Sequence, residues 1–99
     1  MSHTHLTRLA QQLPEAWKST VVARFGAVHL KVLRMDGSLY PDESHAHAEG
    51  LLVIDGRLNL TIDGAEIVVG AGELFVVPPG VSHSVASGSM GTLVILDLG

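Results

Sequence analysis

From residue 20 onward the chain is a series of short apolar runs separated by turn residues. Three Asp-Gly pairs, at Asp36-Gly37, Asp55-Gly56 and Asp63-Gly64, suit turns that need a positive φ. Leu58, Leu60 and Ile62 alternate with polar residues, as in a half-buried strand. Strands are expected over residues 20–25, 28–35, 51–54, 58–62, 67–69, 74–77, 81–85 and 92–98. This pattern predicts an all-β sandwich or barrel rather than alternating strands and helices.

The N-terminal segment is the one good helical stretch. Leu6, Leu9 and Leu13 recur at helical spacing, so a helix is expected over residues 4–12 with Thr4 as its cap. Pro14 ends it, and Trp17 is expected to anchor the segment on the body of the protein. We therefore expect an arm over residues 1–18 and a barrel over residues 19–99, within a single domain.

Composition excludes several classes of partner. The chain has 99 residues, six scattered Lys and Arg, and a formal net charge of −4. Without a basic stripe, binding to nucleic acid is not expected, and a polyanionic substrate is disfavoured. The absence of cysteine excludes disulfides and thiolate chemistry. No signal peptide or membrane-spanning stretch is recognisable, so a cytoplasmic protein without membrane contact is expected.

Two histidine-bearing segments carry the candidate chemistry. The first runs from Glu43 through His45, His47 and Glu49. The second ends at His83, just after a Pro-Pro-Gly turn. Residues two apart in a strand point to one face, so two imidazoles of a His-x-His pair can converge on one ion. The other His-x-His, at residues 3–5, has no partner carboxylate nearby in the sequence and is not expected to take part.

Three imidazoles and one carboxylate would leave two positions of an octahedron open for other ligands. Such a set suits a divalent transition metal, namely Fe, Mn, Ni, Co or Zn. An open position distinguishes a reactive metal site from a purely structural one.

The two segments resemble the two motifs of the cupin superfamily. Gly72, Pro78, Gly80 and His83 match the second motif without a gap, although Ser87 stands where that motif has asparagine. The resemblance covers residues 37 to 87 and is closest to small single-domain bacterial cupins described as mannose-6-phosphate isomerase-like. It implies a double-stranded β-helix, or jelly-roll barrel, carrying the short helical arm.

The first motif has two alternative registers. Counted back from Glu49, the family's two histidine positions fall on Glu43 and His45. The implied ligands are then Glu43, His45, Glu49 and His83, a harder set that would favour Mn or Fe. With a shortened loop, the ligands are instead His45, His47, Glu49 and His83. A third reading keeps the barrel and loses the metal.

The resemblance implies two classes of function. One is a metal-dependent oxygenase, isomerase or lyase acting on a small organic molecule, with the metal as a Lewis acid or an O₂-binding centre. The alternative is a non-catalytic sensor of a small ligand or a metal. Tyr40 is a candidate hydrogen-bond donor to a substrate, and Arg34 or Arg57 could clamp a carboxylate. Phe25, Met35 and Phe75 are expected in the core rather than around a cavity mouth.

A homodimer is expected, because 46% hydrophobic residues is a high share for a chain of 99 residues. One small barrel leaves an apolar sheet face or edge open, and a second copy would cover it. Sedimentation equilibrium at micromolar concentration tests this expectation directly. A single species with the mass of one chain would contradict it.

Overall fold

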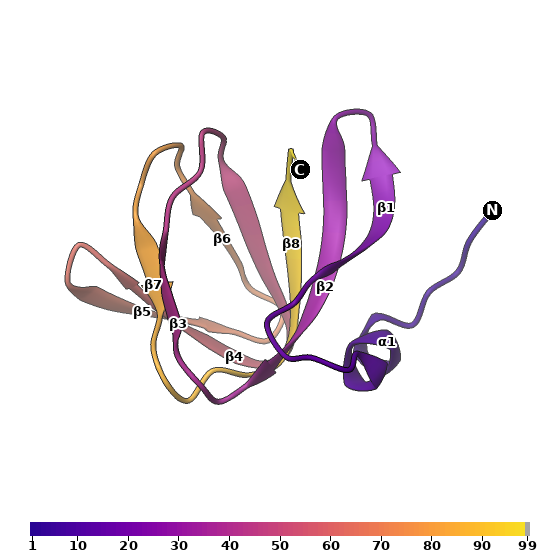
Figure 1. Ribbon diagram of the computed structural model, residues 1–99, viewed down its shortest axis with the longest axis horizontal. Helices are drawn as coiled ribbons and strands as arrows, with labels where there is room; N and C mark the ends of the chain where they lie inside the picture. The colour runs from indigo at the N-terminus through magenta and orange to yellow at the C-terminus, as the bar shows by residue number, and fades with distance from the viewer. Residues whose placement is uncertain (99) are drawn as a thin grey trace.

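The structure is one antiparallel sheet of eight strands that curls into a half-barrel, preceded by one short helix (Figure 1). It is a computed structural model that describes residues 1–98. The elements are α1 (Leu6–Gln12), β1 (Thr20–Phe25), β2 (Val28–Asp36), β3 (Tyr40–Glu43), β4 (Glu49–Ile62), β5 (Ala65–Gly70), β6 (Leu74–Val77), β7 (His83–Val85) and β8 (Met90–Asp97). The spatial order is β1-β2-β8-β4-β7-β3, and β5 and β6 also pair with β4. The expected all-β fold with a short N-terminal helix is confirmed.

Strand β4 pairs with four other strands of the sheet, and its length shows that one sequence prediction was wrong. The runs at 51–54 and 58–62 were expected to be two strands joined by a turn at Asp55-Gly56, but they form one continuous strand of 14 residues. The first half of β4 pairs with β6 and β8, and the second half pairs with β5 and β7. The register shifts between Val53 and Asp55, so the dipeptide forms a bulge rather than a turn.

The bulge changes which side chains of β4 face inward. Before it, Glu49, Leu51 and Val53 are buried, and after it Leu58 and Leu60 are buried. Side chains alternate strictly along a regular strand, so a change from odd to even positions requires an irregularity between them. Both halves of β4 therefore contribute to the same interior.

The bend at this bulge is sterically possible because residue 56 is glycine. It has a φ of 78° and lies opposite Gly91 of β8, whose φ is 105°. A Cβ on Gly56 would overlap the Met90 carbonyl oxygen, and one on Gly91 would overlap the Asp55 carbonyl oxygen. Only glycine allows this approach of the two backbones.

Helix α1 covers part of the outer face of the sheet. Its Ala10 is buried with Val32 of β2 and Val94 of β8 in a second, smaller core. The Thr7 hydroxyl donates to Asp55 at 3.0 Å, which ties the helix to the bulge of β4. The expected cap is corrected, because the side chain of His5 rather than Thr4 accepts from the Arg8 N–H. This helix is far too short and polar to cross a bilayer, and residues 1–98 contain no other.

The remaining turns and strands follow the sequence with small shifts. Strands 20–25 and 74–77 are confirmed residue for residue. Asp63 and Gly64 both have positive φ and join β4 to β5, as a two-residue hairpin requires. Strand β3 was not foreseen as a separate strand. Strand β7 begins at His83, because Val81 still belongs to the turn and donates to the Pro78 carbonyl.

An apolar stretch of the outer sheet face lies on β6. Leu74 and Val76 are more than half exposed and lie opposite Leu52 and Gly50 of β4. An exposed apolar face of this kind is what a second copy would cover in the expected homodimer. Dimerisation stays a prediction.

The Gly56 contact predicts a stability difference between two glycine variants. Gly56→Ala should destabilise the protein by about 2–4 kcal/mol, because strain and overlap with Met90 add together. Gly64→Ala is the matched control: its φ is 77° and nothing lies near its Cβ, so about 1 kcal/mol is expected. Urea unfolding of both variants measures the difference. Equal losses would show that the close approach is not a constraint.

Candidate metal centre and its cavity

The pairing of β3 with β7 brings the two histidine-bearing segments together. Glu43 is the last residue of β3, His83 is the first residue of β7, and the two are direct cross-strand partners. Glu43 is exposed at its tip, whereas His83 is 4% exposed. The strand pairing thus places a carboxylate and a buried imidazole side by side, although 40 positions separate them in the chain.

Glu49 is the buried carboxylate of the cluster. It begins β4 and is 5% exposed. One carboxylate oxygen lies 3.1 Å from Nε2 of His83, and the other lies 3.5 Å from Nε2 of His45. Glu49 therefore lies between the two imidazoles, whose ring centroids are 5.7 Å apart.

His45 lies on the loop between β3 and β4, and the second motif holds that loop in place. The N–H of Gly80 donates to the carbonyl oxygen of His45 at 2.8 Å. Gly80 has a φ of 75° and follows Pro78-Pro79, so the rigid turn presents its N–H to the loop. The Pro-Pro-Gly turn that precedes His83 thus also positions His45.

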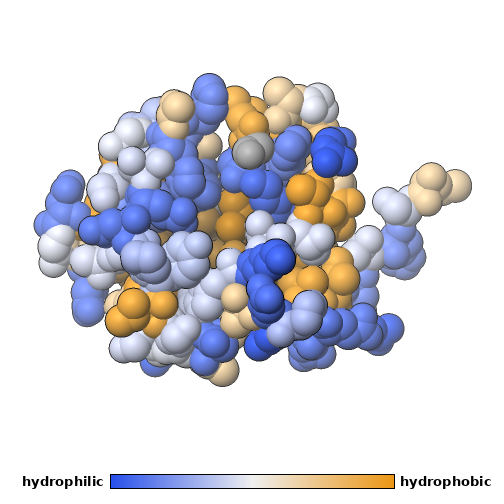
Figure 2. Space-filling view, viewed as in Figure 1, coloured by the Kyte–Doolittle hydropathy of each residue, from blue (hydrophilic) through white to orange (hydrophobic). Residues whose placement is uncertain are grey.

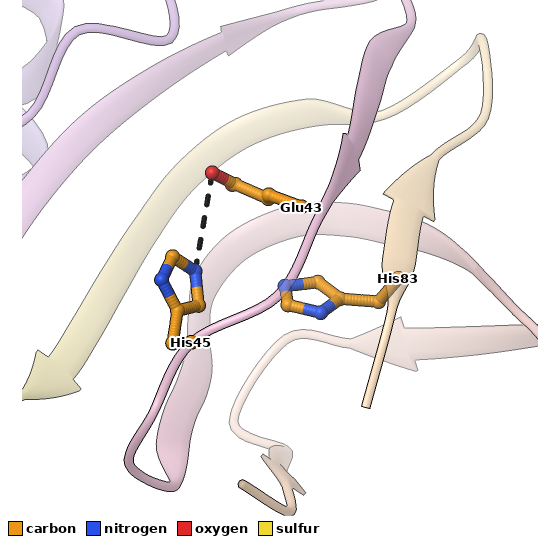
Figure 3. A group of neighbouring side chains, drawn as sticks. All are labelled: Glu43, His45 and His83. Carbon is orange, nitrogen blue, oxygen red and sulfur yellow. Dashed lines mark ion pairs between the residues drawn. The ribbon is translucent and has the colours of Figure 1, made fainter. Parts of the chain in front are cut away.

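Figure 3 shows how Glu43, His45 and His83 face one another across the end of the half-barrel. The Glu43 carboxylate lies 3.9 Å from Nε2 of His45. One ligand-type atom from each of the three residues lies within 4.8 Å of the others, the spacing that a shared metal ion requires. Glu49 is outside this group of three but contacts both imidazoles, so it joins them in the ligand set of the register counted back from Glu49.

The environment of the cluster disfavours an uncompensated negative charge on Glu49. Burial raises the pKa of the Glu49 carboxyl, and nearby Glu43 and Asp97 raise it further, whereas His45 and His83 oppose the shift. Nδ1 of His83 lies 3.1 Å from the Val81 carbonyl and can donate to it, which directs Nε2 toward Glu49. A buried carboxylate beside two imidazole nitrogens is a set of donors suited to a divalent ion.

His47 lies apart from this cluster. Residues 44–48 form a loop and not a strand, so the same-face argument for His45 and His47 does not apply. His47 is exposed, lies outside the group of Glu43, His45 and His83, and lines a surface hollow that also includes His45 and Asp97. The choice between Glu43 and His47 as a metal ligand stays a prediction.

The cluster lies at the edge of a cavity of about 180 Å³ inside the half-barrel. From the viewpoint of Figure 1 the molecule is hollowed, with hydrophobic residues at the floor and hydrophilic residues around the rim (Figure 2). The floor includes Leu33, Leu51, Leu58, Leu60, Leu93 and Ile95. Tyr40, the candidate donor, also lines the cavity.

Three further cavity residues were not foreseen as part of the site. Lys31 of β2 pairs with Asp97 of β8 at 3.1 Å, and both side chains are mostly buried. Their signal in the sequence was a lysine at an inward position of β2, and the pairing of β2 with β8 brings Asp97 to it. Trp17 also lines the cavity, with its ring centroid 5.7 Å from that of Tyr40.

The remaining residues that the sequence singled out pack in the core, bind the backbone or face solvent. Met35 is buried in the main core and Phe75 packs against it, as expected, but Phe25 is 64% exposed because it ends β1 at a hairpin. The Arg34 guanidinium donates to the Leu13 carbonyl and so ties the arm to β2. Arg57 is exposed on β4.

Sequence comparison shows the family. Residues 33–99 match the family described as "Cupin domain". The match spans more than half of the chain, so the protein belongs to the cupin domain family. No curated protein matches the chain.

Solved structures share the fold at low sequence identity. A cupin-2 domain containing protein from Shewanella frigidimarina NCIMB 400 is 21% identical with a TM-score of 0.88, covering 97% of this chain and 94% of that one. A proposed mannose-6-phosphate isomerase from Ralstonia eutropha JMP134 is 17% identical, with a TM-score of 0.81 and coverage of 97% and 96%. Hydroquinone 1,2-dioxygenase PnpCD, solved in complex with Cd²⁺ and 4-hydroxybenzonitrile, is 14% identical, with a TM-score of 0.81 and coverage of 96% and 71%. At these identities the likeness shows the fold alone.

The hydrogen bonds around Asp36 predict a pH dependence. The side chain and backbone N–H of Ser38 and the indole N–H of Trp17 lower the pKa of Asp36 from 3.8 to about 2. Because the folded state favours the ionised carboxylate, Asp36 stabilises the fold above pH 3.8, and this contribution fades as the pH falls toward 2. Asp36→Asn should therefore destabilise the protein at about pH 5.5 and much less at about pH 2.5.

Urea unfolding of Asp36→Asn and of the native chain at both pH values measures this difference. Asp42→Asn, which changes an exposed carboxylate on β3, is the matched control and should show no such pattern. An equal cost of Asp36→Asn at both pH values would contradict the prediction.

Proposed function

We propose that this protein is a metal-binding cupin in which Glu43, His45, Glu49 and His83 bind one divalent transition metal. The observation that supports it is the buried Glu49 carboxylate, which lies between the imidazoles of His45 and His83. Burying a carboxylate is costly unless a cation or strong donors compensate it. A divalent ion would supply that compensation at the point where the donors converge.

The charge of the cavity supports the same proposal. Its lining includes the carboxylates of Glu43, Glu49 and Asp97 and the ammonium of Lys31, a formal charge of −2 when the histidines are neutral. A divalent cation would neutralise this charge. Two imidazoles and two carboxylates form a hard donor set, which favours Mn(II) or Fe(II) over softer metals.

The cavity beside the cluster is the proposed place for a small organic molecule. A divalent metal bound there would act as a Lewis acid or as a centre for O₂. The leucine floor would exclude water from the molecule's apolar part, and the hydroxyl of Tyr40 could donate a hydrogen bond to a polar group on it. Nδ1 of His83 is committed to the Val81 carbonyl, which would keep the ring oriented toward the metal.

Calorimetric titration with Mn²⁺, and with Zn²⁺ as a tighter-binding reference, tests the proposal. The background is the chain carrying His3→Gln and His5→Asn, which removes the N-terminal His-x-His while asparagine still caps α1. One equivalent should bind, and Glu49→Gln or His83→Gln should weaken binding roughly hundredfold. If the His3→Gln, His5→Asn background chain, once stripped of any metal acquired during purification, binds neither Mn²⁺ nor Zn²⁺, the proposal is refuted.

The same titration decides between the two registers. Glu43→Gln should weaken binding about tenfold or more, whereas His47→Gln should leave it within about twofold. Glu66→Gln, an exposed carboxylate on β5, is the control for a general change of charge. The reverse order of the Glu43 and His47 variants would assign the fourth ligand to His47.

A further inference from the structure

We propose that Trp17 and Tyr40 form an aromatic wall that binds an uncharged, planar molecule of one six-membered ring in the cavity. The inference deepens the proposed function and rests on it for its setting, because it names the class of molecule held beside the metal. It depends on the way the two rings are held and on the size and charge of the cavity.

Trp17 is held rigidly in an unusual backbone conformation. Its φ is 67°, which residues other than glycine rarely adopt. Its backbone N–H donates to the Arg34 carbonyl at 2.9 Å. Its indole N–H donates to Asp36 at 2.8 Å and to Ser38 at 3.0 Å. Because the indole N–H is already engaged, the surface of the ring is what Trp17 offers to a ligand.

Tyr40, at the start of β3, is the second residue of the wall. The two ring centroids are 5.7 Å apart and the planes are inclined by 34°. Tyr40 begins β3, the strand whose last residue is Glu43, and both residues line the cavity. A ring that contacts Tyr40 would therefore occupy the same cavity as the proposed metal ligands. Such contacts between aromatic faces favour a planar π system over an aliphatic ring of equal size.

The size of the cavity limits the ligand. Its volume is about 180 Å³, and leucines make up much of the rest of its lining. An apolar cavity of roughly 150 Å³ is known to hold one benzene molecule. The space therefore encloses one six-membered ring with few substituents and is too small to enclose a nucleotide or a disaccharide.

The charges of the metal-free cavity disfavour an anionic ring. The formal charge of its lining is −2, which repels an anion. The one ammonium group of the lining, Lys31, is engaged by Asp97 at 3.1 Å. It is therefore not free to clamp a carboxylate on the ligand.

Phenol, cyclohexanol and benzoate are the probes for this inference. Phenol and cyclohexanol share size and a hydroxyl but differ in planarity, and benzoate adds a negative charge. Trp17 is the single tryptophan of the chain, so its indole N–H gives one ¹H–¹⁵N resonance that reports on the wall. Each probe is titrated against the metal-free protein and against the protein saturated with diamagnetic Zn²⁺.

Phenol should shift the indole resonance saturably in both states. Cyclohexanol should bind about tenfold more weakly, and benzoate should bind more weakly than phenol to the metal-free protein. Tyr40→Leu should weaken phenol binding about fivefold, whereas Tyr40→Phe, which keeps the ring and loses only the hydroxyl, should weaken it less than Tyr40→Leu does. Phe25→Leu changes an exposed aromatic residue outside the cavity lining and is the matched control.

Equal affinity for phenol and cyclohexanol, unchanged phenol binding in Tyr40→Leu, or no saturable shift would each overturn the inference. The same experiments distinguish failure of the proposed metal site from failure of the aromatic wall. If Zn²⁺ binds and phenol does not, the aromatic wall is refuted and the metal site stands. If phenol binds the metal-free protein and no metal binds, the metal site is refuted instead.

Discussion

The contact between the backbones at Gly56 and Gly91 is the constraint on which the cavity depends. At this point β4 bends, and its two halves pair with different neighbours. Both glycines have positive φ, and a side chain on either would overlap the facing backbone. The bulge also shifts the inward positions of β4 from odd to even residues. Without that shift, Leu58 and Leu60 would face away from the interior that Glu49 and Leu51 line.

Polar neighbours from other segments explain why a carboxylate is tolerated in the interior. Glu49 lies at the start of the first half of β4, where β3, β7 and the following loop bring Glu43, His83 and His45 beside it. No buried side-chain nitrogen or oxygen among residues 1–98 lacks a partner, so the polar groups satisfy one another. Burial still disfavours the charge on Glu49. The arrangement gives up some stability at a place where a cation would restore it.

The N-terminal segment is more closely tied to the barrel than an appended arm would be. Thr7 reaches Asp55 at the bulge, Leu13 accepts from Arg34, and Trp17 lines the cavity. Holding Trp17 at a φ of 67° costs of the order of 1–3 kcal/mol, which three hydrogen bonds to β2 and the following turn help to offset. The boundary expected between residues 18 and 19 separates two segments of the chain, but residues from both sides of it line the cavity.

The amino-acid sequence by itself determined the class of fold and the second motif. Its alternating apolar runs, its Asp63-Gly64 hairpin and its Pro-Pro-Gly turn are local features, and local φ preferences are enough to specify them. The sequence also restricted the ligand candidates to five residues in two segments. It did not reveal that Asp55-Gly56 is a bulge, because an Asp-Gly pair suits either a turn or a bulge until the partner strand is known.

Only the tertiary structure decided which polar groups meet. Pairing of β3 with β7 brought Glu43 to His83, and Glu43 rather than His47 lies within ligand spacing of both His45 and His83. The pairing of β2 with β8 turned Lys31 and Asp97 into a buried ion pair, and the arm brought Trp17 to Tyr40. These contacts join residues far apart in the chain. They depend on strand register and on one bend in β4, which no short stretch of sequence specifies.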